Sequence, residues 1–542
     1  VYTRSLRLIL IPLASATICA IWGLGFMRLM HYNLDPLILV IPLLVSARAL
    51  SHSIQFNWRI NEDYVRTRST KESCLSTIKG LFYPGLAGII TDATGIILIS
   101  LIPIPLMTKL GLAIFVWCVS MIFAILIFNP VISLYLPPMR KAREWRDGRR
   151  NGFMEGRLLP MISSLNYKKS ASWVILCCFF VMAVVAFYFN LGLITGDVHE
   201  GSPILKGSSQ YNQDVEFMAR ELPGSMNPML IIFEGKDEGV IKEPEVMKIA
   251  DRFQVYMSKI PEVTMTLSIV NLIKGINMAF YENNPDYFVM PDSRRGIYAN
   301  LHLLTSGGAD PGDFDTYYDF DMQDLSIKIY SANHLPHTID TLLAKARKFI
   351  SENKTKFGEF KIAGGRIGVI AANNDSIVRY ETITTVAAFI LTGLLVALAF
   401  RSLVAGIILV VPLLLSTWFT FGYMAIQGIG MNLQTLPVSV IAIGIGVDYG
   451  VYLISRIHEE YIPTGDLHAA IRTAIGTAGN AVILTGIIII LGVVFWVFSD
   501  IKFQADMGIL LSIVTFFHLL GTVVLLPAIV QIVRPRFILR RN

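Results

Sequence analysis

The run GIGVDYGVYLISRIHEEY, residues 444–461, joins the end of an apolar segment to a charged stretch and places Asp448 within the apolar part. The apolar segment, 432–454, is long enough to cross about 30 Å of hydrocarbon. An ionisable side chain inside a membrane span is costly unless it is paired or hydrated, and it is a functional residue by default. The glycines around Asp448 remove side-chain bulk, so another helix can approach or water can enter. This run predicts a membrane helix with a buried polar site.

The composition of the whole chain is that of an integral membrane protein. Of its 542 residues, 54% are hydrophobic and only 16% are charged, which is too apolar for a soluble surface. The net charge of +6 does not indicate a nucleic-acid partner, because the basic residues lie in short segments beside apolar runs. Ten apolar segments are long enough to span a bilayer: 5–27, 36–56, 74–100, 109–136, 171–194, 381–400, 402–426, 432–454, 469–498 and 507–533.

The basic residues predict the orientation of these segments. A linker at 138–170 is rich in arginine and should be cytoplasmic, because positively charged loops stay inside. Counting crossings from this linker places the polar insert outside, in the periplasm of a bacterium. We therefore expect a multi-pass protein of the inner (plasma) membrane with these parts: first-half helices 1–137, basic linker 138–170, one helix 171–194, insert 195–380, second-half helices 381–534 and a cytoplasmic tail 535–542.

The insert is expected to be a small α+β domain. Its hydrophobic patterns predict helices at 243–258 and 338–353. Runs of β-branched and aromatic residues predict four strands: Met229 to Phe233, Ile297 to Leu304, Ser326 to Tyr330 and Phe360 to Ala363.

An internal repeat relates the two sets of apolar segments at an offset of 397 residues. The motif RSL at 4–6 matches RSL at 401–403, and RIxExY at 59–64 matches RIxExY at 456–461. Matched helices are separated by an even number of crossings, which predicts two helix bundles related by a pseudo-two-fold axis along the membrane normal. The second copy has three elements before its matched region that the first copy lacks, so we expect the chain to be truncated at its N-terminal side.

A polar stripe in the segment 36–56 is the counterpart of the Asp448 region. Arg48, Ser51 and His52 are spaced three and four residues apart, so they share one face of a helix. At the repeat offset, Ser51 corresponds to Asp448 and His52 to Tyr449. The two stripes are expected to face each other across the axis.

Asp92, in the run TDATG at 91–95, lies in the next helix and is a candidate partner for Arg48. Burial raises the pKa of a carboxylate and a nearby cation lowers it, so two acids that share one arginine and a histidine form a candidate proton relay. The alternative is structural. In that case Arg48 and Asp92 form a static pair, His52 is a neutral hydrogen-bonding residue, and Asp448 caps a packing network.

Other chemical motifs are weak. His334 and His337 have no acidic or cysteine partner at ligand spacing, so no metal site is predicted. No phosphate-binding loop with a following Lys-Ser or Lys-Thr occurs, and no nucleophile–histidine–acid arrangement stands out. We expect a protein that is not an enzyme and has no cofactor, with a proton gradient as its energy source.

The run 444–461 resembles the corresponding helices of the resistance-nodulation-division (RND) superfamily, and most closely its MMPL and Patched-like branch, which exports lipids and other hydrophobic molecules. The run SARALSHS at 46–53 and TDATG at 91–95 are similar to first-half motifs of bacterial members, including those associated with hopanoids. The resemblance covers nearly the whole chain. It implies that 1–137 holds family helices 3–6, that 171–194 is helix 7 and that 381–534 holds helices 8–12.

The resemblance also implies roles for the insert and for individual residues. It makes 195–380 the second porter domain, a ferredoxin-like unit that conveys substrate. Asp448 and Tyr449 match the proton-carrying pair of the family, whereas Ser51 and His52 depart from the Asp-Tyr pair found in the first half of some members. A symmetric two-acid relay is therefore not implied.

These observations lead to one functional hypothesis and two alternatives. The hypothesis is a proton antiporter that exports lipids or other hydrophobic molecules, in which Asp448 carries the proton, assisted by Tyr449, by His52 and by Arg48 with Asp92. The alternatives are a sterol-sensing, Patched-like receptor and an accessory factor for protein translocation. Membrane lipids or a hydrophobic substrate are the expected partners. A second copy of the chain and a periplasmic partner are left open, and the substrate-binding residues are unknown.

Overall fold

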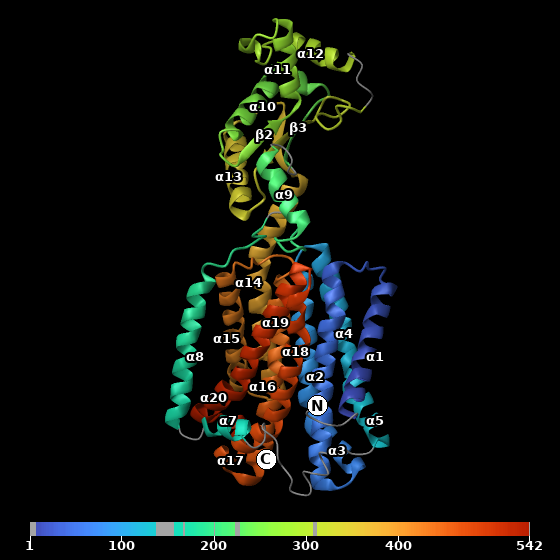
Figure 1. The fold of residues 1–542 in the computed structure, drawn as a ribbon, viewed down its shortest axis with the longest axis vertical. Helices are drawn as coiled ribbons and strands as arrows, with labels where there is room; N and C mark the ends of the chain where they lie inside the picture. The colour runs from blue at the N-terminus through green and yellow to red at the C-terminus, as the bar shows by residue number, and fades with distance from the viewer. Residues whose placement is uncertain are drawn as a thin grey trace. The chain divides into compact units, whose positions relative to one another are not determined.

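The computed structural model describes residues 7–136, 157–165, 169–199, 201–222, 228–306 and 312–540. The RSL motif at 4–6 and most of the basic linker 138–170 lie outside these residues. Contacts divide the chain into two compact units, one formed by Val1–Ile194 with Ser376–Asn542 and one formed by Thr195–Asp375. Figure 1 shows that the first is made of helices and that the second contains both helices and strands.

The first unit is a bundle of long apolar helices. Three of them continue through short π-helical turns, at Ile122–Ile127, Ile475–Gly479 and Gly521–Leu525. The helices of this unit are α1 (Arg7–Leu29), α2 (Pro36–Thr67), α3 (Thr70–Ile97), α4 (Pro105–Met121), α5 (Phe128–Tyr135), α7 (Leu159–Leu165), α8 (Lys169–Asn190), the part of α14 (Gly365–Ala399) from Ser376 onward, α15 (Leu403–Gln427), α16 (Leu436–Thr464), α17 (Leu467–Ala474), α18 (Asn480–Val494), α19 (Lys502–Leu520), α20 (Leu526–Val533) and α21 (Arg536–Leu539).

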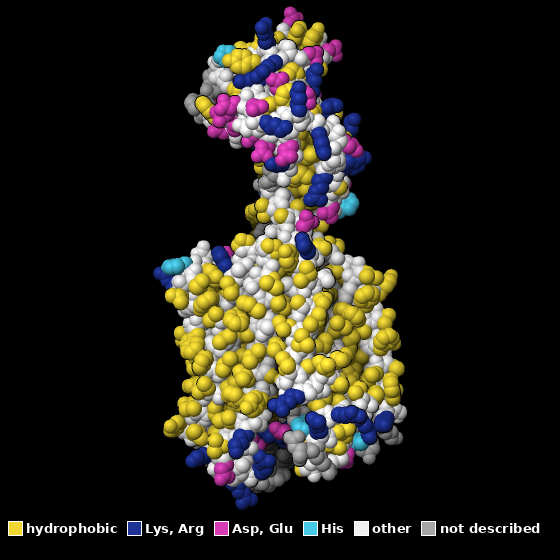
Figure 2. Space-filling view, turned by 180° about the vertical axis from the view of Figure 1, so that it is seen from behind, with side chains coloured by type: hydrophobic (Ala, Val, Ile, Leu, Met, Phe, Trp, Pro, Cys, Tyr) yellow, Lys and Arg dark blue, Asp and Glu magenta, His cyan; other side chains and the backbone are white. Residues whose placement is uncertain are grey.

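Within the described residues, nine helical segments are long and apolar enough to cross a membrane. They correspond to nine of the ten expected spans. The tenth, 36–56, lies in the 32-residue helix α2, which is not among the nine. Figure 2 shows hydrophobic side chains over most of the outer face of this unit, as contact with hydrocarbon requires.

The interior position of α16 decides where a polar site can lie. Nearly all of α16 is buried, whereas α8 is mostly exposed. Helix α16 packs against α3, α15, α17 and α19, while α2 packs against α1, α3 and α18. The polar residues of α2 and α16 are therefore shielded from lipid by other helices.

The second unit is built on a four-stranded antiparallel sheet in the order β2-β3-β1-β4. Alternate residues of β1 and β3 are buried, and Ile231 pairs with Ile327 in register. Helices α10 and α13 bring Phe253 and Phe349 into the same core, with ring centroids 5.1 Å apart. The elements are α9 (Gln210–Glu221), β1 (Met229–Gly235), α10 (Pro244–Met257), β2 (Val263–Leu267), α11 (Ile269–Phe280), α12 (Arg294–Ser306), β3 (Leu325–Ser331), α13 (Pro336–Glu352) and β4 (Gly358–Gly364).

Most of the secondary structure expected in this unit is confirmed, but one strand is wrong. The segment Ile297 to Leu304 forms helix α12, not a strand. Its buried residues Ile297 and Leu301 are four apart, with Leu304 one turn further, which is the helical period and not the period of two. The edge strand β2 was not predicted, because its five residues alternate apolar residues with threonines over too short a run to stand out.

Candidate functional site

Arg48 of α2 lies at the centre of a buried charge cluster in the helical unit. Its Nη2 donates to Oδ2 of Asp92 on α3 and to Oδ2 of Asp448 on α16. It also lies 3.3 Å from the carbonyl oxygen of Gly444. The side chains of Arg48, Asp92 and Asp448 are 6%, 1% and 4% exposed. One guanidinium is therefore shared by two carboxylates out of contact with bulk water.

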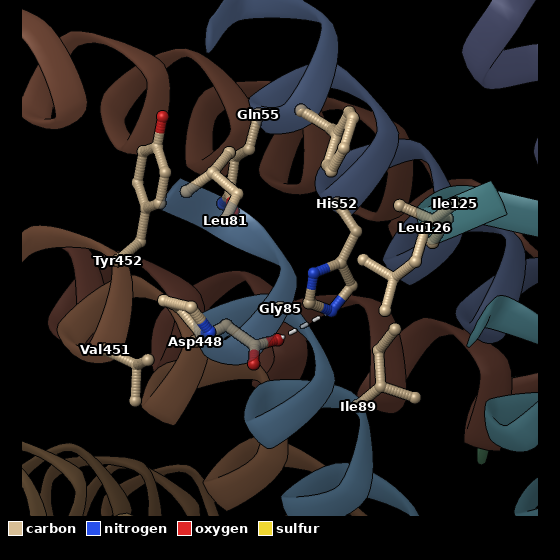
Figure 3. Close-up of a pocket in the computed structure, with 12 residues that line it drawn as sticks. His52, Gln55, Leu81, Gly85, Ile89, Ile125, Leu126, Asp448, Val451 and Tyr452 are labelled. Atoms are coloured by element: carbon tan, nitrogen blue, oxygen red, sulfur yellow. Dashed lines mark ion pairs between the residues drawn. The ribbon is translucent and has the colours of Figure 1, made fainter. Parts of the chain in front are cut away.

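His52 lies one turn along α2 from Arg48 and faces the same carboxylates. Its Nε2 is 2.9 Å from Oδ2 of Asp448 and 3.8 Å from Oδ2 of Asp92. Figure 3 shows the imidazole of His52 directed toward the Asp448 carboxylate. Asp92 pairs with Arg48 as the sequence suggested, and the stripes of α2 and α16 face each other.

The charges of the cluster do not balance when His52 is neutral. Two carboxylates and one guanidinium leave one uncompensated negative charge, and a single added proton cancels it. An unbalanced charge in a low-dielectric interior is costly. A purely structural ion pair would balance its charges, and this cluster does not.

Two glycines allow the helices to come this close. A Cβ atom on Gly444 would lie 2.5 Å from Oδ1 of Asp92, and one on Gly88 would lie 2.1 Å from Oδ1 of Asp448. Any larger side chain at either position would displace a carboxylate. Gly444 belongs to the run that predicted the site. Gly88 was missed, although it is four residues before Asp92 and therefore on the same face of α3.

Tyr449 and Ser51 form a neighbouring polar contact outside the Arg48 cluster. Tyr449 is fully buried, and its hydroxyl lies beside those of Ser51 and of Thr485 on α18 without normal hydrogen-bond geometry. Thr485 also lies 3.5 Å from the side-chain amide of Gln55. Thr485 was not singled out from the sequence, because a single threonine in an apolar helix carries little signal.

A small cavity adjoins the cluster. It has a volume of about 30 Å³ and its lining includes His52, Gln55, Asp448, Val451 and Tyr452 (Figure 3). This volume can hold one or two water molecules, and the lining offers the polar partners that buried water requires. The cavity thus places room for water next to both His52 and Asp448.

His52, Asp92 and Asp448 offer ligand atoms within 4.8 Å of one another, a spacing compatible with a metal ion. The Arg48 guanidinium bonds both carboxylates at that place. A metal cation there would have to displace this positive charge or be repelled by it. The donor set therefore does not fit a metal site while Arg48 is in place.

A second buried histidine was missed by the sequence analysis. His518 of α19 is fully buried, and a Cβ atom on Gly446 would lie 2.7 Å from its ring. Neither ring nitrogen has a hydrogen-bond partner among the residues described. The available signal was a single histidine within the apolar segment 507–533.

Comparison with known proteins agrees with this architecture. The profile of the MMPL family matches residues 344–541. A membrane protein of Methanocaldococcus jannaschii is 22% identical over 302 residues, which are 54% of this chain and 72% of that protein. The trehalose monomycolate exporter MmpL3 of Mycolicibacterium smegmatis is 38% identical over 53 residues, which are 10% of this chain and 5% of the exporter.

A solved structure shares the fold over almost the whole chain. The hedgehog release protein Disp from the water bear Hypsibius dujardini, determined by cryo-electron microscopy, has a TM-score of 0.63 at 13% sequence identity, and the match covers 98% of this chain and 70% of that one. At this identity the likeness concerns the fold alone. The chain is therefore a multi-pass membrane protein that is similar to the MMPL family over residues 344–541 and that shares its fold with this solved structure.

Proposed function

We propose that this chain is a proton-driven transporter that exports a lipid or another hydrophobic molecule, with Asp448 as the principal proton-carrying residue. The observation that carries the proposal is the buried cluster in which one arginine serves two carboxylates and a histidine lies 2.9 Å from one of them. Its members come from three different helices. A proton bound there changes the attraction between those helices, which is what coupling a proton gradient to movement requires.

The proposed movement takes place between two repeated halves. Adding the predicted offset of 397 to the bounds of α1, α2 and α3 gives 404–426, 433–464 and 467–494, close to the bounds of α15, of α16 and of α17 with α18. Helix α2 packs against α18, and α16 packs against α3. The repeat makes α2 equivalent to α16 and α3 equivalent to α17 with α18, so the contact α2–α18 is the counterpart of the contact α16–α3. This pair of contacts supports a pseudo-two-fold arrangement of the helices. Arg48 and His52 then belong to one half and Asp448 to the other.

The second unit is proposed to be the porter domain. Its principal elements follow the order β1-α10-β2-β3-α13-β4, with α11 and α12 between β2 and β3, and the sheet order is β2-β3-β1-β4. This is the βαββαβ pattern of ferredoxin-like folds. We place this unit, the predicted insert 195–380, on the periplasmic side of the inner membrane, where it would receive substrate.

The substrate class is inferred from the family. One relative is named as an exporter of trehalose monomycolate, a lipid, which supports a hydrophobic cargo for this chain. The particular lipid, a second copy of the chain and a periplasmic partner are not specified by any contact described here. Within the proposed relay, Tyr449, Ser51 and Thr485 would shape the surroundings of Asp448, and His52 would exchange protons with it.

The test uses the protein in liposomes with an imposed pH gradient, and proton flux is followed with and without candidate lipids. We expect lipid-stimulated flux in the wild type and its loss in Asp448→Asn. Asp506→Asn is the matched control, because Asp506 lies on α19 and pairs with Lys502 at 2.5 Å, away from the cluster. Equal flux in wild type and Asp448→Asn would contradict the proposal. Lipid binding without flux in the wild type would instead favour a sterol-sensing receptor.

A further inference from the structure

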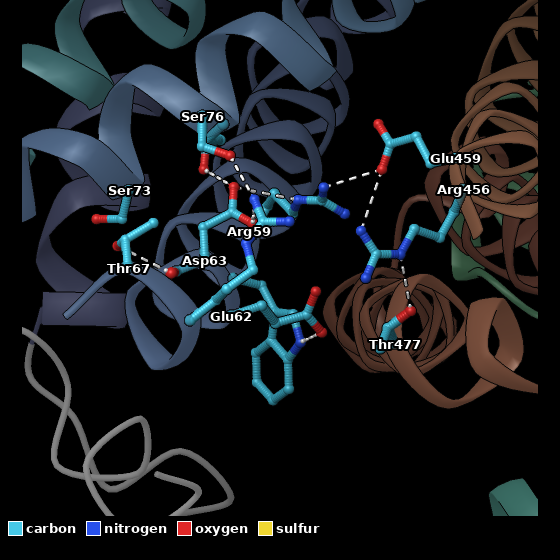
Figure 4. Close-up of polar contacts among 12 residues, drawn as sticks. Arg59, Glu62, Asp63, Thr67, Ser73, Ser76, Arg456, Glu459 and Thr477 are labelled. Carbon is cyan, nitrogen blue, oxygen red and sulfur yellow. Dashed lines mark hydrogen bonds and ion pairs between the residues drawn. The ribbon is translucent and has the colours of Figure 1, made fainter. Parts of the chain in front are cut away.

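A second group of ion pairs joins α2 to α16 beyond the Asp448 cluster. Arg59 of α2 donates to Glu459 of α16 at 2.9 Å and lies 3.4 Å from Asp63 on its own helix. Arg456 approaches the same Glu459 carboxylate at 3.1 Å. Figure 4 shows the Glu459 carboxylate between the two guanidinium groups. The Arg59–Glu459 ion pair therefore links the two helices that carry the proposed proton site.

The Arg59–Glu459 ion pair and the Asp448 cluster lie along the same helix faces. On α2, Arg59 follows His52 by seven residues, which is two helical turns or about 10 Å. The small cavity beside His52 and Asp448 lies between them, because its lining includes Gln55 and Tyr452, each one turn further along its helix. Polar groups and space for water thus extend from the cluster toward the ion pair.

Beyond the ion pair, the protein has an open, charged cavity of about 630 Å³. Arg59 and Glu459 line it together with Arg66, whose side chain is 72% exposed. The cavity therefore reaches solvent. It lies at the end of α2 and α16 that carries the arginines, which the positive-inside pattern predicts to be cytoplasmic.

We infer that the Arg59–Glu459 ion pair is a gate that closes the proton path between the Asp448 site and the arginine-bearing end of the helices. The inference rests on the proposed proton-driven function. Arg59 is 6% exposed, and the intact pair lies between the small cavity and the open one, where it interrupts a continuous path of water. The pair joins α2 to α16, so movement of these helices apart separates it. These are the helices that Arg48 holds together through Asp448, so protonation of Asp448 weakens the attraction that keeps the gate shut.

The pairing differs between residues that the repeat makes equivalent. At the offset of 397, Arg59 corresponds to Arg456 and Glu62 to Glu459. Both arginines pair with the acid four residues further along their own helix, Asp63 and Glu460. Among the ion pairs described, only Arg59 also reaches an acid of the other half, Glu459. The repeated motif therefore does not by itself impose the ion pair between the halves. This is compatible with a contact that opens and closes.

The experiment measures proton flux without lipid, again in liposomes with an imposed pH gradient. Glu459→Gln removes the negative partner of Arg59 with little change of shape, and we expect a several-fold rise in uncoupled flux. Glu460→Gln is the matched control, because Glu460 is the next residue and pairs only with Arg456 among the ion pairs described. The double variant Asp448→Asn with Glu459→Gln should return to the wild-type level, because the leak passes through Asp448.

Equal flux in Glu459→Gln and Glu460→Gln would overturn the gate, and so would a leak that persists in the double variant. If Glu459→Gln does not fold, Glu459→Asp decides, because it keeps the charge but shortens the side chain by one methylene; an unchanged flux there also overturns the gate. The two hypotheses fail separately. If Asp448→Asn leaves lipid-stimulated flux unchanged, the proposed function fails. If it abolishes that flux and Glu459→Gln leaks no more than its control, only the gate fails.

Discussion

The two charge clusters between α2 and α16 contain the same kinds of residue but differ in balance and in access to water. In the inner cluster, Arg48 serves Asp92 and Asp448, all of them buried. In the outer cluster, Glu459 has two arginine partners and a side chain that is 33% exposed. Solvent can compensate a change of charge in the outer cluster but not in the inner one. This difference supports the two proposals made above, in which the inner cluster responds to protons and the outer one controls their passage.

The largest effect is expected from removing the central cation. Arg48→Gln leaves two buried carboxylates without their shared partner, and breaking a buried ion pair in this way typically costs about 3–5 kcal/mol. We expect a strong fall in thermal stability in detergent, relieved at acidic pH because protonated carboxylates no longer need the arginine. A melting temperature equal to that of the wild type at neutral pH would show that the inner cluster contributes no more than a surface pair.

An intermediate loss of stability is expected when Gly88 of α3, which faces the inner cluster, is replaced by alanine. Gly80 of α3, which faces the outer cluster, provides the comparison. A Cβ atom on Gly88 would lie 2.1 Å from Oδ1 of Asp448, which Arg48 and His52 hold in place, so Gly88→Ala should destabilise by about 1–3 kcal/mol and reduce flux. A Cβ atom on Gly80 would lie 3.1 Å from Oε1 of Glu459, whereas Arg59 and Arg456 both pair with the other carboxylate oxygen, Oε2. Gly80→Ala should be neutral, or stabilise by up to about 1 kcal/mol through helix propensity. Thermal unfolding and proton flux are measured on both variants. Equal stability and equal flux in Gly88→Ala and Gly80→Ala would contradict the expected difference between the two clusters.

The smallest effect is expected at Arg456. Its ion pairs with Glu459 and Glu460 lie three and four residues along the same helix, and such pairs contribute about 0.3–0.5 kcal/mol each. Arg456→Gln should therefore lower stability by less than about 1 kcal/mol, as read from thermal unfolding in detergent. A loss as large as that of Arg48→Gln would mean that the outer cluster is as tightly coupled to the fold as the inner one.

Much of the site was accessible from the sequence because intramembrane charges are rare. Arg48, His52, Asp92 and Asp448 stood out against apolar surroundings, and helical periodicity put Arg48 and His52 on one face. Gly88, Thr485 and His518 were missed. Small and neutral residues are common in membrane helices, so their proximity to a charge is visible only when the helices are packed together.

The sequence by itself determined that the chain is a membrane protein, where most of its helices run and which residues are out of place in lipid, because these follow from local hydropathy and from the spacing of residues along one helix. The sequence pattern predicted a strand where α12 forms, because the short apolar run was compatible with both the helical and the strand period. The sequence suggested that two acids share one arginine, and the tertiary structure shows that they do. Only the tertiary structure decided that His52 faces Asp448 more closely than Asp92 and that Arg59 reaches Glu459. These contacts join residues about 400 positions apart or on different helices, and the packing of the helices, not the pattern within any one of them, sets those distances.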